Sequence, residues 1–477
     1  MRELDRIAIQ AFGIPAYTLM QRAGQALFAA ITEQWPAARS VCVVCGAGNN
    51  GGDGYIVARL AREQGWQVAV VGVANPAGLL GDAARACQDY LASGGELLAF
   101  NGTLPVADVL VDALLGTGLT RTLEGDYAAV VKAMNAVSTP VVAADIPSGL
   151  QADTGQPCGC AVEADMTVTF IGMKQGLLTG QARTYVGVLR FAGLDVPAAV
   201  YARLPTDMQV IGLSEVQAAL PPRPRCAHKG HFGHSLLVGG YAGMAGAIRL
   251  AGEAALRTGS GLVSVATHPA HAAWLNLTRP ELMVQTIESA GDLRSVWAGK
   301  TVVGIGPGLG QTAWSRAVLV AVLGSGLPMV VDADGLNLLA GMPCQRGQWI
   351  LTPHPAEAAR LLAGTTAEVE RDRVAAARRL QQQYGGVVVL KGAGTLVASA
   401  DGVAFCTLGN PGMATAGMGD VLTGILTGLL AQGLGLGQAA RVGVYLHAQA
   451  ADRAAQGGER GLLAGDVIDH LCGVVNP

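Results

Sequence analysis

The chain has 477 residues and a formal net charge of −3, and only 14% of its residues are charged. One hydrophobic core rarely extends over so long a chain, so we expect two domains. The nearly balanced charge gives no excess of basic residues that would favour binding to nucleic acid. The first residues contain no apolar secretory segment. We therefore expect a cytoplasmic protein that binds no nucleic acid.

The first part of the chain alternates between helical and strand patterns. Apolar residues recur at helical spacing over 5–34, and a short apolar strand follows at 41–45. A glycine-rich turn at 46–54 then leads into a helix, which is the order typical of nucleotide-binding α/β folds. The turn is not Gly-x-Gly-x-x-Gly, because two asparagines and one aspartate interrupt it. Their side chains can bind ribose hydroxyls or a cation.

Oxygen-bearing side chains follow two further apolar strands. Asp112 lies inside the strand pattern that starts at 109, and Asp145 and Ser148 follow the strand that starts at 141. A buried charge is costly unless it is paired or bound to a cation. Each aspartate could cap the next helix, but oxygens from several strand ends favour a shared site for potassium or magnesium. Strands at 166–170 and 186–191 are expected to complete this first sheet.

The region 205–225 separates the two predicted domains, 1–212 and 213–477. It contains Pro-Pro-Arg-Pro-Arg, which cannot continue a helix or an inner strand. Three histidines then recur every third residue, at His228, His231 and His234. Glycines between them and the strand after them favour a polar loop over a zinc site.

The second domain repeats the arrangement of a strand followed by a glycine- or proline-rich turn. Such turns occupy 240–249, 306–310, 352–357 and 391–395, and a strand end with two acids occupies 330–337. Surface and terminal helices are predicted at 366–383, 438–456 and 465–473. Turns at strand ends fit an open α/β sheet, whose ligands lie at the carboxyl ends of the strands.

The stretch 409–420, Gly-Asn-Pro-Gly-Met-Ala-Thr-Ala-Gly-Met-Gly-Asp, is predicted to open into a buried helix near Gly417. Unpaired backbone N–H groups and the helix dipole make such a start a cradle for phosphate. Asp420 is either a general base for a substrate hydroxyl or a residue that complements the dipole. The next 20 residues, 421–440, carry no charge, but five glycines favour a core helix over a membrane span.

Taken together, these motifs resemble the bifunctional NAD(P)H-hydrate repair enzymes, in which an epimerase domain precedes an ADP-dependent dehydratase domain of the ribokinase-like superfamily. The first domain carries the resemblance at 19–24, 48–54, 112–118 and 145–149, and the second at 229–234, 306–310, 352–355, 391–395 and 409–420. The resemblance implies two three-layer αβα domains, the first Rossmann-like and the second ribokinase-like.

The resemblance also implies site residues. In the first domain the hydrate site would comprise Asn49, Asn50, Gly51, Gly52, Asp53, Gly116, Thr117, Gly118, Leu119, Thr120, Arg121, Thr122 and Asp145, and the potassium ligands would be Asn50, Asp112 and Ser148. In the second domain the hydrate contacts would be Ala247, Gly308, His354 and Asp420, and the nucleotide contacts Lys391, Gly392, Ala393, Gly394, Thr395 and Gly419. Asp420 matches the superfamily's catalytic base.

The implied substrates are NADHX and NADPHX, the hydrates of NADH and NADPH, which carry a hydroxyl on carbon 6 of the nicotinamide ring. Asp420 would activate that hydroxyl toward the terminal phosphate of ADP, and loss of phosphate would restore the ring double bond and leave AMP. Potassium is implied in the first domain and magnesium with ADP in the second. ADP and ATP are not distinguished by spacing.

Some expectations concern the protein as a whole. We expect no membrane association and a homo-oligomer. A second interpretation is a ribokinase-like small-molecule kinase fused to a non-catalytic nucleotide-binding module, which would release a phosphorylated organic product instead of free phosphate.

Overall fold

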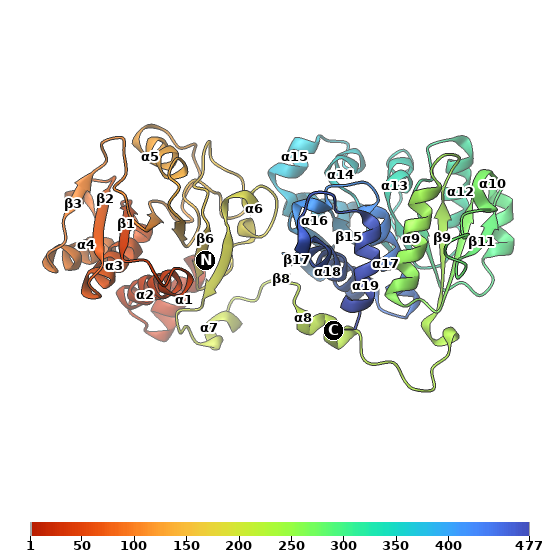
Figure 1. Cartoon of the computed structure of the whole chain (residues 1–477), viewed down its shortest axis with the longest axis horizontal. Coiled ribbons are helices and arrows are strands. Elements are labelled where there is room, and N and C mark those ends of the chain that lie inside the picture. Colours follow the sequence, from red (N-terminus) through yellow and green to blue (C-terminus); the bar gives the residue numbers. More distant parts are fainter. Residues whose placement is uncertain (1, 477) are drawn as a thin grey trace. The chain divides into compact units, whose positions relative to one another are not determined.

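The computed structural model describes residues 2–476 and divides into two compact units (Figure 1). The first unit ends at Thr206 and the second begins at Asp207. This division differs from the predicted one at 212/213. Residues 207–212 belong with the second unit, because strand β8 (Met208–Val210) pairs with β17 (Gly402–Cys406) in its sheet.

The first unit alternates strands with helices. Its strands are β1 (Ser40–Cys45), β2 (Gln67–Gly72), β3 (Leu97–Ala99), β4 (Val109–Ala113), β5 (Val141–Ala144), β6 (Met166–Phe170) and β7 (Val188–Ala192). Its α-helices are α1 (Arg2–Phe12), α2 (Ala16–Gln34), α3 (Asn49–Glu63), α4 (Gly81–Ala92), α5 (Gly125–Asn135), α6 (Ala182–Tyr185) and α7 (Ala198–Ala202), with short 3₁₀ turns η1 (Pro76–Gly78) and η2 (Gln175–Leu177).

The seven strands form one parallel sheet in the order β3-β2-β1-β4-β5-β6-β7. Side chains of β1 alternate between two cores: Val43 packs with residues of α2 and α3, and Val44 packs with residues of α5. Helices on both faces confirm the predicted αβα layering of this unit. The strand order reverses between β1 and β4, and open sheets bind ligands beside such a point.

The second unit contains ten strands. They are β8 and β17, named above, with β9 (His234–Gly239), β10 (Leu262–Thr267), β11 (Met283–Thr286), β12 (Val302–Ile305), β13 (Met329–Val331), β14 (Trp349–Leu351), β15 (Val387–Leu390) and β16 (Thr395–Ser399). Its α-helices are α8 (Leu213–Ala219), α9 (Ala245–Thr258), α10 (Pro269–Ala272), α11 (Leu293–Val296), α12 (Ala313–Leu323), α13 (Ala333–Ala340), α14 (Pro355–Leu361), α15 (Thr366–Arg371), α16 (Arg373–Tyr384), α17 (Met418–Ala431), α18 (Leu436–Ala454) and α19 (Ala464–Val474). The 3₁₀ turns are η3 (Lys229–Phe232), η4 (Ala290–Asp292), η5 (Pro411–Met413) and η6 (Ala455–Gly457).

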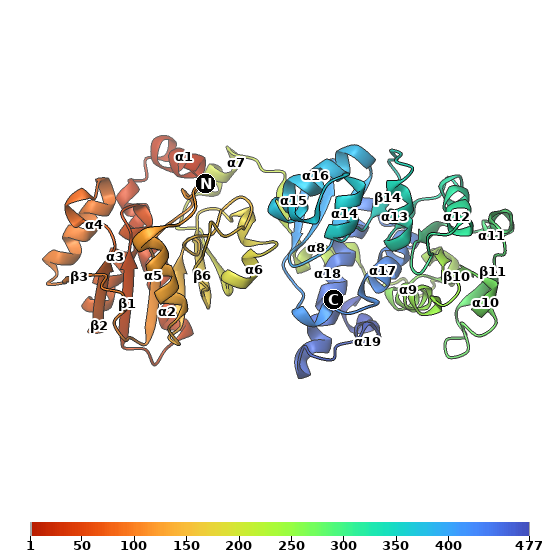
Figure 2. The ribbon, with the colours of Figure 1, turned by 90° about the horizontal axis from the view of Figure 1, so that it is seen from above.

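These strands form a sheet in the order β11-β10-β9-β12-β13-β14-β15-β16-β17-β8. The strands from β11 to β15 pair in parallel, whereas β16 is antiparallel to both neighbours. One face is covered by α9, α17, α18 and α19, and the other by α12, α13, α14 and α16 (Figure 2). Here the strand order reverses between β9 and β12, so the ends of these strands and of β13 and β15 mark the expected site.

Several element boundaries differ from the predictions for local reasons. The helical pattern at 5–34 forms two helices, because Gly13 adopts φ +68° and Pro15 precedes α2. The pattern at 366–383 also forms two helices, since Asp372 caps the second by accepting from Ala375 N at 2.9 Å. Strand β7 starts at Val188 instead of 186, after Gly187 at φ +58°.

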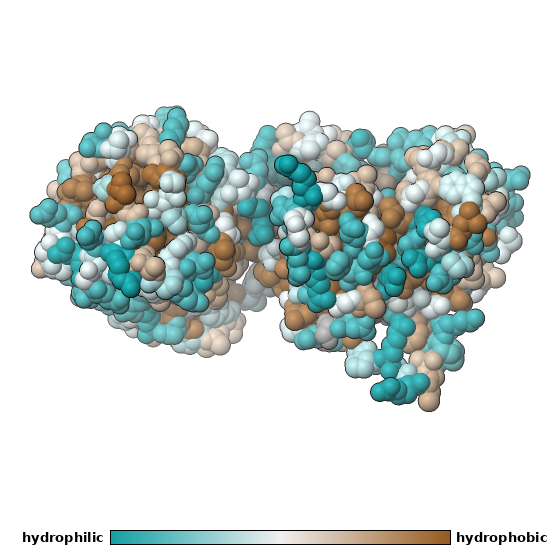
Figure 3. Space-filling model, in the orientation of Figure 1, coloured by the Kyte–Doolittle hydropathy of each residue, from teal (hydrophilic) through white to brown (hydrophobic). Residues whose placement is uncertain are grey.

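The uncharged stretch 421–440 is divided between α17 and α18. Every α17 residue from Val421 to Ala431 is buried, as a core helix requires. Across residues 2–476, no helix combines the length and the apolar character needed to cross a membrane. On the visible face of each unit, hydrophilic and intermediate residues surround smaller hydrophobic areas (Figure 3).

Because each unit has its own sheet and core, each is expected to fold alone. Fragments 1–206 and 207–477 should both be soluble and unfold cooperatively on heating, as followed by circular dichroism. A cut at 150/151 is the control, since it separates β5 from β6 within one sheet and should prevent folding. Insolubility of both fragments from the 206/207 cut, beside a soluble full chain, would contradict separate cores.

Candidate functional sites

A cleft of about 1000 Å³ lies in the first unit beside the reversal between β1 and β4. Most residues predicted to hold the hydrate line it, namely Asn49, Asn50, Asp53, Gly116, Thr117, Gly118, Leu119, Thr120, Arg121, Thr122 and Asp145. The volume suits a whole dinucleotide, because pockets of 300–1,000 Å³ hold ordinary small ligands. The structure therefore brings these side chains to one place, while their binding roles stay predictions.

The predicted turn at 46–54 is largely helical. Helix α3 begins at Asn49, so the Asn-Asn-Gly-Gly-Asp segment forms its first turns and its free N–H groups lie at the cleft. Gly51 and Gly52 do not contribute to the lining. A Cβ on Gly51 would meet the carbonyl oxygen of Gly46 at 2.1 Å, and one on Gly52 would meet Met20 Sδ at 2.6 Å. Their small size lets the helix pack closely.

The three predicted potassium ligands meet around the backbone of Leu115. Asn50 Nδ2 donates to the Leu115 carbonyl at 3.0 Å, and Ser148 Oγ accepts from Leu115 N at 2.8 Å. Asp112 accepts from Ser148 N at 2.7 Å and from Ser148 Oγ at 2.6 Å. Burial raises the pKa of Asp112 to about 6, although these hydrogen bonds oppose the shift. No cationic side chain of the described residues pairs with this fully buried carboxylate.

Asp145 belongs to a second acidic group in the same cleft. It adopts φ +65° just after β5 and forms an ion pair with Lys174, which is only 4% exposed. Asp53 and Asp5 lie close enough for the charge of Asp145 to raise the pKa of each, after the larger effect of burial. The sequence analysis did not identify Lys174. The signal was a lone lysine shortly after the end of β6, at the sheet edge where Asp145 lies.

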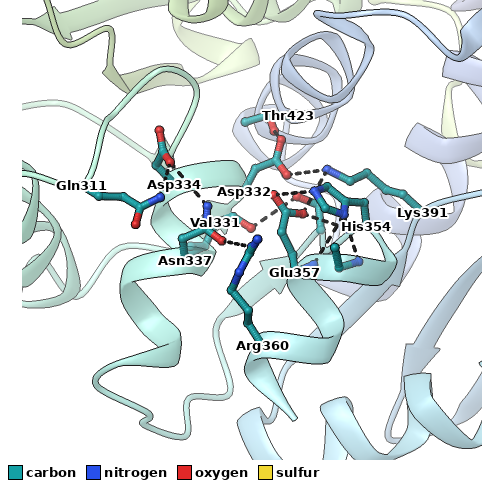
Figure 4. A network of polar contacts seen from close by, with 12 residues as sticks. Gln311, Val331, Asp332, Asp334, Asn337, His354, Glu357, Arg360, Lys391 and Thr423 are labelled. Carbon is teal, nitrogen blue, oxygen red and sulfur yellow. Dashed lines mark hydrogen bonds and ion pairs between the residues drawn. The ribbon is translucent and has the colours of Figure 1, made fainter. Parts of the chain in front are cut away.

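In the second unit a buried ion pair joins the ends of β13 and β15 (Figure 4). Lys391 Nζ lies 2.7 Å from Asp332 Oδ1, and Thr423 Oγ1 of α17 donates to Asp332 Oδ2 at 2.8 Å. Glu357 lies 3.8 Å from the same ammonium. Burial would lower the pKa of Lys391, but Asp332 and Glu357 together raise it. Asp332 was noted only as a strand-end acid, and Glu357 and Thr423 were not selected.

The start of α17 lies against this ion pair. Gly417 adopts φ +92°, and the position of a Cβ on Gly419 is 3.3 Å from Lys391 Nζ and 3.4 Å from Asp332 Oδ2. Asp420 follows in the first helical turn. Burial and then the charge of Asp332 raise the pKa of Asp420 to about 7, against the lowering effect of Lys391. A carboxyl group with such a pKa can exchange protons at neutral pH.

The other predicted hydrate contacts approach the same strand ends. A Cβ on Gly308 would lie 3.2 Å from Ala247 Cβ, so these two residues are adjacent. His354 caps α14 by accepting from Ala356 N at 3.1 Å, and its Nε2 is 3.4 Å from Glu357 Oε1. Burial, followed by the charge of Lys391, lowers the pKa of His354, so it is neutral at pH 7.

Hydrogen bonds to backbone carbonyls hold the predicted nucleotide loop in place. Buried Arg373 donates to the carbonyl of Lys391 at 3.0 Å, and Thr395 Oγ1 donates to the carbonyl of Gly392 at 2.9 Å. The loop therefore connects β15 and β16 in a fixed shape beside Lys391. Gly392, Ala393, Gly394 and Thr395 all lie on this connection, as predicted, and their contacts with nucleotide stay predictions.

The stretch before α17 is held by the last long helix. Asn410 Nδ2 and Gly409 N donate to the two carboxylate oxygens of Asp452 in α18, at 2.9 and 3.0 Å.

In the described residues, no group of three or more His, Cys, Asp or Glu is arranged to hold a metal ion. His228 and His231 stack on each other at 3.7 Å in an exposed turn, and His234 begins β9.

Two family models match the chain. The model described as NAD(P)H-hydrate dehydratase matches residues 235–472, and the model described as YjeF-related protein N-terminus matches residues 16–176. The chain is 48% identical over its full length to the bifunctional NAD(P)H-hydrate repair enzyme Nnr of Coxiella burnetii, of which it covers 98%. It is 46% identical to the enzyme of the same name from Escherichia coli, covering 93% of that protein.

Solved structures resemble the second unit. A ribokinase-like superfamily protein from Enterococcus faecalis matches 57% of this chain and 98% of its own, with 29% identity and a TM-score of 0.54. The ADP/ATP-dependent NAD(P)H-hydrate dehydratase from Bacillus subtilis, co-crystallised with ATP and Mg²⁺, covers the same fractions with 29% identity and a TM-score of 0.50. These matches confirm the ribokinase-like architecture expected for this part of the chain.

The buried ion pair of the second unit yields a stability prediction. Lys391→Met should leave Asp332 buried without its cation and destabilise the second unit by about 3–5 kcal/mol, measured by urea unfolding of fragment 207–477. The double variant Lys391→Met/Asp332→Asn removes both charges and should recover part of this loss. A single variant as stable as the parent would show that water already reaches Asp332.

Proposed function

The chain belongs to the family of bifunctional NAD(P)H-hydrate repair enzymes, and from this membership we propose which unit carries which activity. The first unit would interconvert the R and S forms of NADHX and NADPHX, and the second would dehydrate the S form with ADP. The observation that carries the second assignment is the position of Asp420, in the first turn of α17 against the Lys391–Asp332 pair. The resulting enzyme is an isomerase and a carbon–oxygen lyase in one chain.

In the proposed dehydration, Asp420 takes the proton of the carbon-6 hydroxyl. The hydroxyl oxygen then attacks the terminal phosphate of ADP, and AMP leaves. Backbone N–H groups at the start of α17 face the transferring phosphoryl group and stabilise its charge. Expulsion of phosphate from carbon 6, together with loss of a proton from carbon 5 to solvent, restores the double bond between these two carbons. Ala247, Gly308 and His354 would contact the hydrate.

The nucleotide would bind along Lys391, Gly392, Ala393, Gly394, Thr395 and Gly419. Lys391 supplies a positive charge near the phosphates, although Asp332 already neutralises much of it. Magnesium would arrive with the nucleotide, because it is usually held by phosphates and one or two carboxylates, and Asp332, Asp334 and Asp420 lie close together there. Bound magnesium would neutralise phosphate charge. ADP is proposed as the phosphoryl donor, and the experiment below compares it with ATP.

In the first unit, Asn50, Asp112 and Ser148 would hold potassium. The fit is chemical: Asp112 and Ser148 are hydrogen-bonded to each other, Ser148 Oγ and Asn50 Nδ2 contact the backbone of Leu115, and within residues 2–476 no cationic side chain pairs with buried Asp112. Bound potassium would supply the compensating charge and hold the loop at 116–122, which lines the cleft. A cytoplasmic location and a homo-oligomeric state stay predictions.

The kinase interpretation is not favoured, since relatives of the whole chain are named repair enzymes and not kinases.

The direct test mixes the protein with NADPHX and either ADP or ATP. The return of NADPH absorbance together with release of inorganic phosphate supports repair. A phosphorylated organic product without NADPH would support a kinase.

Asp420→Asn tests the proposed base. Dehydration of S-NADPHX should fall by about 10²–10⁴-fold, because the proton acceptor is lost while the helix start is kept. In the parent protein the rate should rise with pH through about 7, as Asp420 ionises, and this rise should disappear in the variant. Asp469→Asn, an exposed acid on α19, is the control. Near-normal turnover with a lower melting temperature would assign Asp420 to the helix dipole alone.

Asp112→Asn tests the proposed cation site. Epimerisation should weaken and lose its response to added potassium, because the only charged ligand is removed. Dehydration of pure S-NADPHX should be unchanged, since it belongs to the other unit. The measurement compares both rates in potassium and in tetramethylammonium buffers. Epimerisation that is unchanged both in potassium-free buffer and in the variant would exclude the assignment.

A further inference from the structure

Two carboxyl groups in the cleft of the first unit differ in the hydrogen bonds and ion pairs that they form. Asp145 is anchored through one oxygen, Oδ1, which accepts from Phe170 N at 3.0 Å, from Thr169 Oγ1 at 3.4 Å and from the ammonium of Lys174. Its other oxygen, Oδ2, accepts no hydrogen bond from the described residues. The ion pair orients one oxygen of Asp145 and leaves the other open to the cleft that Asp145 lines.

Asp53 has no such support. Its side chain is 8% exposed and lines the same cleft, yet its carboxyl takes part in no hydrogen bond or ion pair with the residues that the structure describes. Burial raises its pKa well above the usual value, and the charges of Asp145 and Asp5 add to this, while Lys174 opposes it. Asp53 therefore has a raised pKa and faces the ligand space of the cleft that Asp145 also lines.

Such a pair of environments assigns acid and base roles, because catalysis at one centre needs one group that gives a proton and one that takes it. We propose that Asp53 is the proton donor and Asp145 the proton acceptor of the epimerisation. This inference rests on the proposed function of the first unit. It extends that function from ligand contact to named proton transfers.

The chemistry balances for a carbon that bears both a hydroxyl and a ring nitrogen. Asp145 takes the hydroxyl proton, the electrons of that O–H bond form the C=O bond, and the bond between carbon 6 and the ring nitrogen breaks. Its electron pair goes to the nitrogen, which receives the proton of Asp53. The open aldehyde rotates about its bond to carbon 5. When nitrogen attacks the other face of the aldehyde, its proton returns to Asp53 and Asp145 gives its proton to the carbonyl oxygen, which forms the epimer.

Lys174 acts through Asp145 as a positioning residue. Its ammonium donates to Asp145, to Thr169 Oγ1 at 2.8 Å and to the carbonyl of Phe170 at 3.0 Å, which uses all three of its N–H groups. None remains for the substrate. Lys174 therefore keeps Asp145 oriented, while Asp53 and Asp145 contact the ring.

The test uses the full chain with purified R-NADPHX and excess ADP, so that the appearance of NADPH reports epimerisation. Asp53→Asn should lower this rate by about 10²–10⁴-fold and remove its decline at alkaline pH, which reflects loss of the Asp53 proton. Asp145→Asn should lower it by a similar factor. The matched control is Asp126→Asn, an exposed carboxyl group in the first turn of α5 that does not line the cleft, which should keep the parent rate.

Each variant also carries an internal control, since dehydration of S-NADPHX by the second unit should be unchanged. Lys174→Met should lower the epimerisation rate, because Asp145 loses the ammonium that orients it, and Lys174→Arg should restore the rate. In deuterium oxide no deuterium should enter carbon 6, because its C–H bond is never broken. Normal epimerisation by Asp53→Asn, or deuterium at carbon 6, overturns the inference. A parent protein that uses S-NADPHX but never R-NADPHX instead overturns the epimerase function itself.

Discussion

In both units a single buried lysine makes it possible to place acidic side chains where parallel strands end. Lys174 pairs with Asp145, and Lys391 pairs with Asp332. Burial of an isolated carboxylate costs several kcal/mol, and the nearby ammonium offsets this cost only at short range and in good geometry. The lysine therefore fixes the position of one aspartate. Other acids nearby are left with less support.

This difference in pairing affects the pKa values of the acids at both sites. Beside each supported aspartate lies a second one that receives no direct partner: Asp53 in the first unit and Asp420 in the second. Burial and the neighbouring negative charge raise the pKa of both, to about 7 for Asp420. The two sites thus arise from one electrostatic arrangement, in which a paired carboxylate raises the proton affinity of an unpaired one.

The elements were predictable where the physical cause is local. Apolar runs such as Val41–Cys45 and Val387–Leu390 identified strands, and glycine-rich turns identified their ends. Lys174, Glu357 and Thr423 were not predictable in the same way, because each acquires its role from a partner 29, 34 or 91 positions away. Nor does spacing reveal that the Asn-Asn-Gly-Gly-Asp segment is helical, since that depends on Gly51 packing against Gly46.

Asp112 is a third acidic side chain at the end of a strand. Asp145 and Asp332 each have a lysine, but Asp112 has only the N–H and O–H donors of Ser148 and Leu114, at 2.6–3.2 Å. Neutral donors reduce the cost of burying a charge without cancelling the charge. With a pKa of about 6, Asp112 remains mostly ionised at pH 7. A monovalent cation from solution would supply the positive charge that Asp112 lacks among residues 2–476, which supports the proposed potassium site.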